Sequence, residues 1–126
     1  MNVREDFFYL PTHEWVQFVD ETTALIGISD YAQHALGDIV YISLPDVDDT
    51  IEQGKSFCDI ESVKAVSDVY APVTGVVVAI NEDLEDAPEK LNESPYDTWI
   101  VKVEGTFDRE QLLDSTAYKK LLELEG

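Results

Sequence analysis

The sequence predicts a mostly β fold, an antiparallel sandwich or flattened barrel with one short internal helix and a helical tail at the C-terminus. Short runs of apolar and β-branched residues recur along most of the chain, and proline, glycine or clustered acidic residues separate them. Leucines at helical spacing occur only near the C-terminus. Short strands divided by turn residues are typical of sandwiches and barrels, so the last segment is expected to pack as a tail on a β core.

The strands follow from the apolar runs and from the turn residues that end them. The first run contains Trp15, Val16 and Phe18, and the second is short and β-branched. The third stops at Pro45, and a later break falls near Pro72, because proline cannot continue a strand ladder. In chain order, the expected strands are residues 14–19, 23–28, 39–44, 56–60, 66–70, 76–80 and 98–103.

One short internal helix is expected at residues 31–36. Asp30 is a candidate N-cap, Gln33 stands three residues later, and Gly37 is the expected stop. Residues 84–93 are acidic and contain a proline, so they are interpreted as a loop with at most one helical turn.

The C-terminus is expected to be helical over residues 108–113 and 115–124, with Ser115 as the N-cap of the last helix. The candidate apolar face of this tail consists of Leu112, Leu113, Leu121, Leu122 and Leu124. No low-complexity linker divides the chain. We therefore expect residues 1–126 to form one domain, with a core at about residues 9–103 and a helical tail at 106–126.

Size and charge narrow the classes of function. A chain of 126 residues can bury a core without disulfides or metals, and no apolar run approaches the roughly 20 residues of a membrane span. The N-terminus resembles neither a signal peptide nor a transit peptide, which predicts a cytoplasmic protein. The net charge of −19 disfavours nucleic acid and membrane surfaces and favours partners with basic docking surfaces. The alternative is that this charge only maintains solubility.

The usual catalytic arrangements are missing from the sequence, which predicts a protein that is not an enzyme. Cys58 is the single cysteine, so a zinc cluster is excluded, and its strand-like surroundings favour a small buried side chain. His13 is expected to be structural rather than a general base, and His34 is expected at the surface. The sequence contains neither a Gly-x-Ser-x-Gly motif nor a glycine-rich phosphate loop.

The segment most suggestive of chemistry is residues 59–75. Two strand-like runs flank Lys64, and a Pro-Val-Thr-Gly turn follows the second run. If residues 63–65 form the tip of a hairpin, Lys64 projects into solvent from a rigid support. Local turn propensity does not place this hairpin, because no Asn-Gly or Asp-Gly occurs there.

This segment resembles the lipoate-attachment segment of the glycine cleavage H protein family, and other segments agree in order and spacing. The resemblance extends from about Tyr9 to Lys102. The matching segments are Thr-His-Glu-Trp-Val at 12–16, Gly-Ile-Ser-Asp-Tyr-Ala-Gln at 27–33, Leu-Gly-Asp-Ile-Val-Tyr at 36–41, Leu-Pro at 44–45, Glu-Ser-Val-Lys-Ala at 61–65, Ser-Asp-x-Tyr-x-Pro-Val-x-Gly at 67–75, and Asn-x-Ser-Pro-Tyr at 92–96 with Trp99.

The resemblance implies a lipoyl/biotinyl-type barrel-sandwich hybrid and a lipoic acid joined by an amide to Lys64. In lipoyl-type domains the acid three residues before the lysine and the glycine eleven after it serve as recognition markers, here Glu61 and Gly75. Alternatively, Gly75 supplies only the positive φ of a turn, and Glu61 is one more solvated acid. Biotin carriers instead resemble Met-Lys-Met, whereas this chain has Val63 and Ala65 beside the lysine.

The resemblance also implies a role in the glycine cleavage system. The carrier takes an aminomethyl group from a pyridoxal-phosphate glycine decarboxylase (P protein) and delivers it to a tetrahydrofolate-dependent aminomethyltransferase (T protein). A dihydrolipoamide dehydrogenase (L protein) reoxidises the arm, and a lipoyl ligase or transferase attaches it. By matching position, Thr12, Glu14 and Asp68 are candidates to hold the cationic amine in a cleft, with charge-assisted hydrogen bonds. Thr12 as a turn residue and Asp68 as a surface acid are the alternatives.

Two departures from the family pattern leave other functions open. Residues 95–99 lack the glycines that usually precede the tryptophan, and Asp48 with Asp49 replaces a common glycine. The main alternative is an H-protein-like paralogue that acts in lipoate relay or an oxidative sulfur pathway. A hydrolase and a purely structural interaction domain are the alternatives from other classes. The sequence does not define the oligomeric state, the docking faces or the route of lipoylation.

Overall fold

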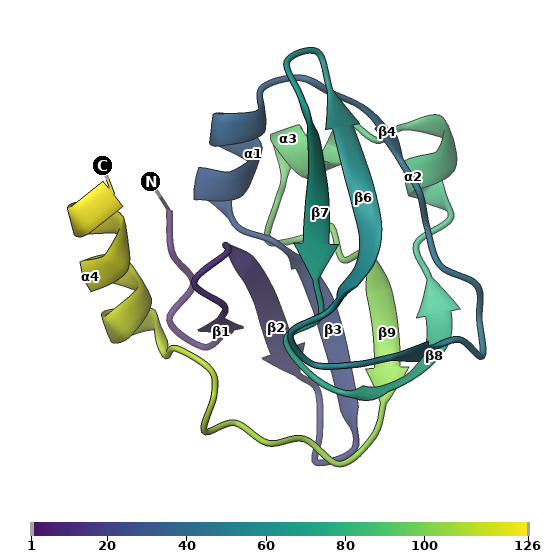
Figure 1. Ribbon diagram of the computed structural model, residues 1–126, viewed down its shortest axis with the longest axis vertical. Coiled ribbons are helices and arrows are strands. Elements are labelled where there is room, and N and C mark those ends of the chain that lie inside the picture. The colour runs from purple at the N-terminus through teal and green to yellow at the C-terminus, as the bar shows by residue number, and fades with distance from the viewer. Residues whose placement is uncertain (1, 126) are drawn as a thin grey trace.

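The computed structural model describes residues 2–125, which form two antiparallel sheets (Figure 1). The larger sheet has the strand order β1-β2-β3-β9-β8-β5, and the smaller has the order β4-β6-β7. The strands are β1 (Phe8–Tyr9), β2 (Glu14–Phe18), β3 (Thr23–Ile28), β4 (Ile39–Ile42), β5 (Thr50–Ile51), β6 (Ser56–Ser62), β7 (Val66–Tyr70), β8 (Gly75–Ile80) and β9 (Val101–Glu104). This mostly β architecture confirms the predicted fold class, and sequence reasoning missed only the two-residue strands β1 and β5.

Within residues 2–125, four helices accompany the sheets: α1 (Asp30–Leu36), α2 (Asp83–Asp86), α3 (Lys90–Glu93) and α4 (Ser115–Glu125). Helix α1 ends at Gly37, whose φ of 77° suits a residue without Cβ, as predicted. The expected cap was wrong. Ser29 precedes the helix and accepts a hydrogen bond from the Ala32 amide, whereas Asp30 lies in the first turn and binds the Gln33 side chain.

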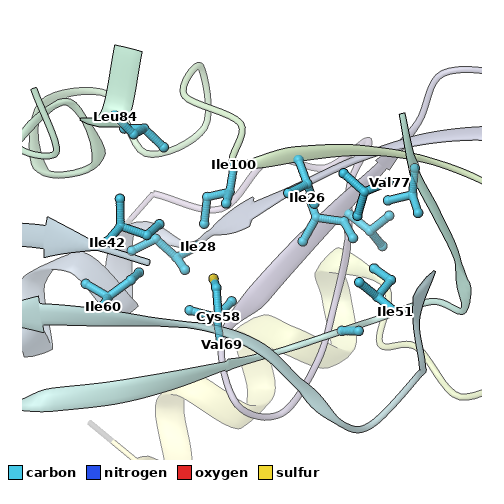
Figure 2. Packing of buried hydrophobic residues seen from close by; sticks show 14 of the residues in the cluster. Ile26, Ile28, Ile42, Ile51, Cys58, Ile60, Val69, Val77, Leu84 and Ile100 are labelled. Atoms are coloured by element: carbon cyan, nitrogen blue, oxygen red, sulfur yellow. The ribbon is translucent and has the colours of Figure 1, made fainter. Parts of the chain in front are cut away.

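The core lies between the two sheets, where β-branched side chains from both interlock (Figure 2). Ile26 and Val77 come from the larger sheet, and Ile60 and Val69 come from the smaller. Cys58 is also buried there, which agrees with its interpretation as a small apolar side chain. Burial raises the pKa of its thiol, and this disfavours the reactive thiolate.

Helix α4 packs outside the sandwich, beside β1 (Figure 1). A second apolar cluster of Phe7, Tyr9, Trp15 and Tyr118 holds it there. The Tyr9 and Tyr118 rings are stacked, with centroids 4.1 Å apart and an interplanar angle of 3°. The tail is thus attached mainly through aromatic rings, with Leu121 and Leu122 adding partly buried contacts.

Several expectations for the less regular segments were wrong. Residues 84–93 contain parts of two short helices rather than a single turn. Residues 108–113 are not helical, because Leu113 pairs with Tyr9 in an isolated antiparallel bridge. Asp114 rather than Ser115 caps α4, since its carboxylate accepts from the Ala117 amide. Leu124 is 87% exposed and belongs to no apolar face.

Candidate functional site

Lys64 lies at the tip of the β6–β7 hairpin, the most projecting part of the upper edge in Figure 1. Ser62 closes this turn: its amide donates to the Ala65 carbonyl at 2.8 Å, and its hydroxyl accepts from the amides of Lys64 and Ala65. The Val63 amide donates to the Asp38 carbonyl, which ties the tip to the chain that enters β4. Serine side-chain bonding therefore builds a turn for which the local sequence has no Asn-Gly signal.

The Lys64 side chain is exposed and passes over the end of α1. A Cβ placed on Gly37 would lie 3.0 Å from the Lys64 Cε, so the aliphatic part of the lysine borders this glycine. No ion pair in residues 2–125 involves Lys64. The amine is thus presented to solvent from a support whose backbone is fixed by hydrogen bonds.

Glu61 lies next to the hairpin tip on an exposed row of the smaller sheet. It pairs with Tyr41 on one side and with Val66 on the other, and all three side chains are exposed. Tyr41 and Val66 are 54% and 65% exposed, which is high for apolar residues. Any protein that approaches Lys64 along this face meets the Glu61 carboxylate between two apolar side chains.

Gly75 is not at the tip; it begins β8, beyond the opposite end of β7. The turn interpretation was wrong, because Gly75 is not among the glycines with positive φ. A Cβ there would lie 2.5 Å from the Glu104 carbonyl oxygen and 2.9 Å from the Val103 side chain. The position needs glycine because β9 approaches so closely.

Replacing Gly75 with alanine is expected to lower the free energy of unfolding by about 1–3 kcal/mol, because the contact with Glu104 involves backbone that cannot rotate away. Urea denaturation measures this loss, with Val76→Ala on the exposed face of the same strand as the control. The folded fraction should be lipoylated at a nearly normal rate. If the Gly75→Ala protein folds but is not lipoylated, Gly75 does not act only by permitting the close packing of β8 on β9.

The structure brings the three predicted cleft residues together. Thr12, Glu14 and Asp68 line one pocket of about 160 Å³, although they come from a turn, from β2 and from β7. Its other walls are largely apolar and include one face of α1. The remaining lining residues are His13, Ile28, Ala32, Ala35, Leu36, Ile60, Ser67 and Val69.

Glu14 is the unusual member of this pocket, because its carboxylate is buried and the residue is only 2% exposed overall. It accepts hydrogen bonds from the Thr12 hydroxyl and, at 2.8 Å, from the Tyr70 amide. Burial raises the pKa of this carboxyl from 4.5 to about 7, and the two hydrogen bonds only partly oppose that rise. None of the ion pairs in the described part of the chain neutralises Glu14, so the pocket favours a cationic occupant.

Sequence reasoning missed several residues of the pocket. Ala32, Ala35 and Leu36 lie at helical spacing on one face of α1, and that periodicity was the available signal. The Tyr70 amide could not be foreseen, because a backbone donor has no sequence signature. Thr12 is in a turn, as its alternative interpretation held, but its hydroxyl also binds Glu14. Asp68 is exposed, as its interpretation as a surface acid held, although it also lines the pocket.

The two histidines differ in environment. His13 is packed between Tyr31 and Tyr118 and binds Glu125, which fits the predicted structural role. Burial lowers the pKa of its imidazole, although Glu125 opposes the shift. His34 is exposed, as expected. Among residues 2–125 there is no group of three or more His, Cys, Asp or Glu side chains that could hold a metal ion.

The departing segment 95–99 lies away from this pocket. The Pro95 carbonyl accepts from the Trp15 indole, and the Trp99 carbonyl accepts from the side-chain amide of Asn81. Tyr96 packs edge-on against Phe7. The altered loop is therefore fixed by the second apolar cluster and contributes nothing to the lining of the Glu14 pocket.

A hairpin that presents one exposed lysine beside a pocket with a buried carboxylate, on two antiparallel sheets, fits the class of cofactor-carrier domains. The family model described as glycine cleavage H-protein matches residues 7–125. The chain therefore belongs to the glycine cleavage H-protein family, whose members are lipoyl carriers rather than catalysts.

Individual relatives agree with this assignment. The glycine cleavage system H protein of Lachnoclostridium phytofermentans is 52% identical, covering 99% of this chain and 98% of the relative. The probable H protein of Thermococcus kodakarensis is 51% identical, covering 95% and 92%. The crystal structure of an H protein from Mycobacterium marinum superposes with a TM-score of 0.90 at 32% identity, covering 96% and 99%.

Within the described residues, no helix has the length and apolar character needed to cross a membrane.

Proposed function

We propose that Lys64 bears a lipoyl group in amide linkage and that the chain carries an aminomethyl group between enzymes of the glycine cleavage system. The observation that supports this most strongly is the convergence of Thr12, Glu14 and Asp68 in one pocket at the foot of the lysine hairpin. Ser67, which also lines the pocket, follows Lys64 by three residues, a distance of roughly 10 Å along a strand. The pocket is therefore close enough for a long arm on Lys64 to reach.

The residues present fit a lipoyl arm with a cationic end. When bound, this group supplies a disulfide that accepts the aminomethyl group, is reduced in doing so and is later reoxidised. The apolar wall of α1 suits an alkyl chain, and the opposite side of the pocket offers two carboxylates and a hydroxyl. Glu14 and Asp68 would hold the amine by charge-assisted hydrogen bonds, with Thr12 orienting the Glu14 carboxylate.

The pocket also limits the access of water to the part of a cargo that lies against its buried residues, whereas Thr12, Ala35 and Asp68 in the lining are exposed. Ile60 and Val69 close its inner side and are almost inaccessible to solvent. A buried cargo keeps the reactive carbon away from bulk water until a partner withdraws the arm. The tether meanwhile raises the effective concentration of the cargo at a partner's active site to about the millimolar range.

The proposed partners are the P, T and L proteins and a lipoyl ligase or transferase. The exposed row of Tyr41, Glu61 and Val66 gives the attaching enzyme a surface to recognise beside Lys64, a carboxylate between two apolar side chains. Gly75 would contribute indirectly, by permitting the close packing of β8 on β9. The net charge of −19 favours partners whose docking faces are basic. A cytoplasmic location is part of this proposal.

The test is the intact mass of the lipoylated protein before and after incubation with glycine and the P protein of the same host. We expect a gain of one aminomethyl group, with no gain when glycine is omitted. A protein that is lipoylated but does not load would contradict the glycine cleavage role and favour the H-protein-like paralogue. A protein that is not lipoylated at Lys64 in its host would contradict the carrier role itself.

A further inference from the structure

Helix α4 contacts the pocket residue His13 through two side chains, Tyr118 and Glu125. Tyr118 is completely buried, and its oxygen lies 2.6 Å from the Ser29 hydroxyl and 2.8 Å from His13 Nδ1. The other ring nitrogen of His13 lies 2.9 Å from the Glu125 carboxylate at the end of α4. Two residues of one helix therefore hold His13 from both sides.

These contacts form one directional chain of hydrogen bonds. Burial lowers the pKa of His13, which favours the neutral imidazole. Since the Glu125 carboxylate can only accept, the neutral ring carries its proton on Nε2 and its Nδ1 accepts from the Tyr118 hydroxyl. Tyr118 then accepts from the Ser29 hydroxyl, which itself accepts from the Ala32 amide. Each proton along the chain is donated to one acceptor, and the two central hydroxyl groups, those of Tyr118 and Ser29, are buried, which favours a rigid arrangement.

Two members of this hydrogen-bond chain, Ser29 and His13, act on walls of the pocket. Ser29 caps α1, whose Ala32, Ala35 and Leu36 line the apolar wall. His13 stands between Thr12 and Glu14 in a left-handed conformation, with φ at 81°, and its carbonyl accepts from the Ser29 amide at 2.9 Å. Such a conformation is unfavourable for a residue with a side chain and persists only where its surroundings hold it.

We propose that Tyr118 is a positioning residue of the carrier: its hydroxyl holds α1 and the 12–14 segment at the spacing that lets the pocket retain the cargo of the arm. The inference rests on the proposed function, since the pocket matters only if the arm enters it. It also assigns a role to α4, although this helix contributes no residue to the pocket lining. The helix acts on the pocket from outside, through the Tyr118 hydroxyl.

The chain offers a matched pair of variants, Tyr118→Phe and Tyr9→Phe. The two rings are stacked on each other, and each hydroxyl has two hydrogen-bond partners. The Tyr9 hydroxyl bonds to the backbone of Arg4, and neither residue lines the pocket. Both variants keep the aromatic packing, so both should fold, and similar losses in melting temperature are expected from each.

Two readouts separate positioning from general stability. In the unlipoylated protein, hydrogen–deuterium exchange of the α1 amides should rise by roughly two- to tenfold in Tyr118→Phe, the equilibrium shift expected from a lost buried hydrogen bond. In the loaded protein, the time for which the aminomethyl mass is retained should shorten by a similar factor. Tyr9→Phe should match the wild type in both measurements, and lipoylation of Lys64 should be normal in both variants.

The outcomes distinguish failure of this inference from failure of the proposed function. If Tyr118→Phe and Tyr9→Phe behave alike in α1 exchange or in cargo retention, the positioning role of Tyr118 is refuted. Glu14→Gln serves as the reference for the pocket itself. If that variant retains its cargo as long as the wild type does, the pocket does not hold the arm, and the proposed function loses its support whatever Tyr118 does.

Discussion

Replacing Lys64 with arginine is expected to abolish lipoylation completely while leaving the fold unchanged. The guanidinium stays protonated and delocalised at any ordinary pH, so it cannot act as the nucleophile that an acyl transfer requires. The side chain is exposed at a turn closed by Ser62, and no ion pair within residues 2–125 depends on it. The free energy of unfolding should therefore change by less than about 0.5 kcal/mol. Intact mass after coexpression with a lipoyl ligase and lipoate measures the loss.

Lys55→Arg is the matched control, because Lys55 is also an exposed lysine but lies in the turn before β6 and pairs with Glu52. The Lys55→Arg protein should be lipoylated normally at Lys64. A sharper variant moves the lysine by one position, combining Lys64→Ala with Ala65→Lys. We expect no modification, since the Ser62 turn fixes the direction in which each position points. A lipoyl mass on Lys64→Arg would contradict the assignment of the attachment site.

The second large effect is expected from Glu14→Gln, as a change in the pH dependence of stability. A carboxyl whose pKa is higher in the folded protein binds a proton more readily there than in the unfolded chain. Its contribution to stability is therefore fully present below pH 4.5 and is lost as the pH rises through about 7. The rise in pKa from 4.5 to about 7 corresponds to roughly 3 kcal/mol. The substituted glutamine would be neutral at every pH, so the variant should gain about this much relative to the wild type between about pH 4 and pH 8.

Urea denaturation at several pH values measures this difference, and Glu61→Gln is the control, because Glu61 is an exposed carboxyl on the outer face. Parallel stability curves for wild type and Glu14→Gln would show that the carboxylate is not buried as described. The same substitution removes the charge that we propose holds the amine. If Glu14→Gln is more stable than the wild type at pH 8 but loses its cargo sooner, the buried Glu14 carboxylate lowers the stability of the protein while it holds the cargo.

Hydrophobic patterning predicted the larger strands because each of them contributes apolar side chains to the buried interior, with clear alternation of buried and exposed residues in β6 and β9. The runs at 23–28 and 66–70 are correct to the residue, and the others differ by a few positions at their ends. The two-residue strands β1 and β5 could not be predicted, since neither is long enough to show alternation. The tail was misjudged for a related reason: leucine spacing indicated helix through 108–113, but pairing of Leu113 with Tyr9 holds that segment extended.

The sequence by itself determined the fold class, and its family motifs predicted Lys64 as the attachment site and Thr12, Glu14 and Asp68 as candidate cleft residues. Only the tertiary structure decided that these three residues share one pocket, because they are brought together across two sheets by burial of a common core. It also decided that Gly75 is required by the approach of β9 and that Tyr118 reaches His13 and Ser29 from the far end of the chain. Such contacts join residues as much as 105 positions apart, and local periodicity holds no information about them.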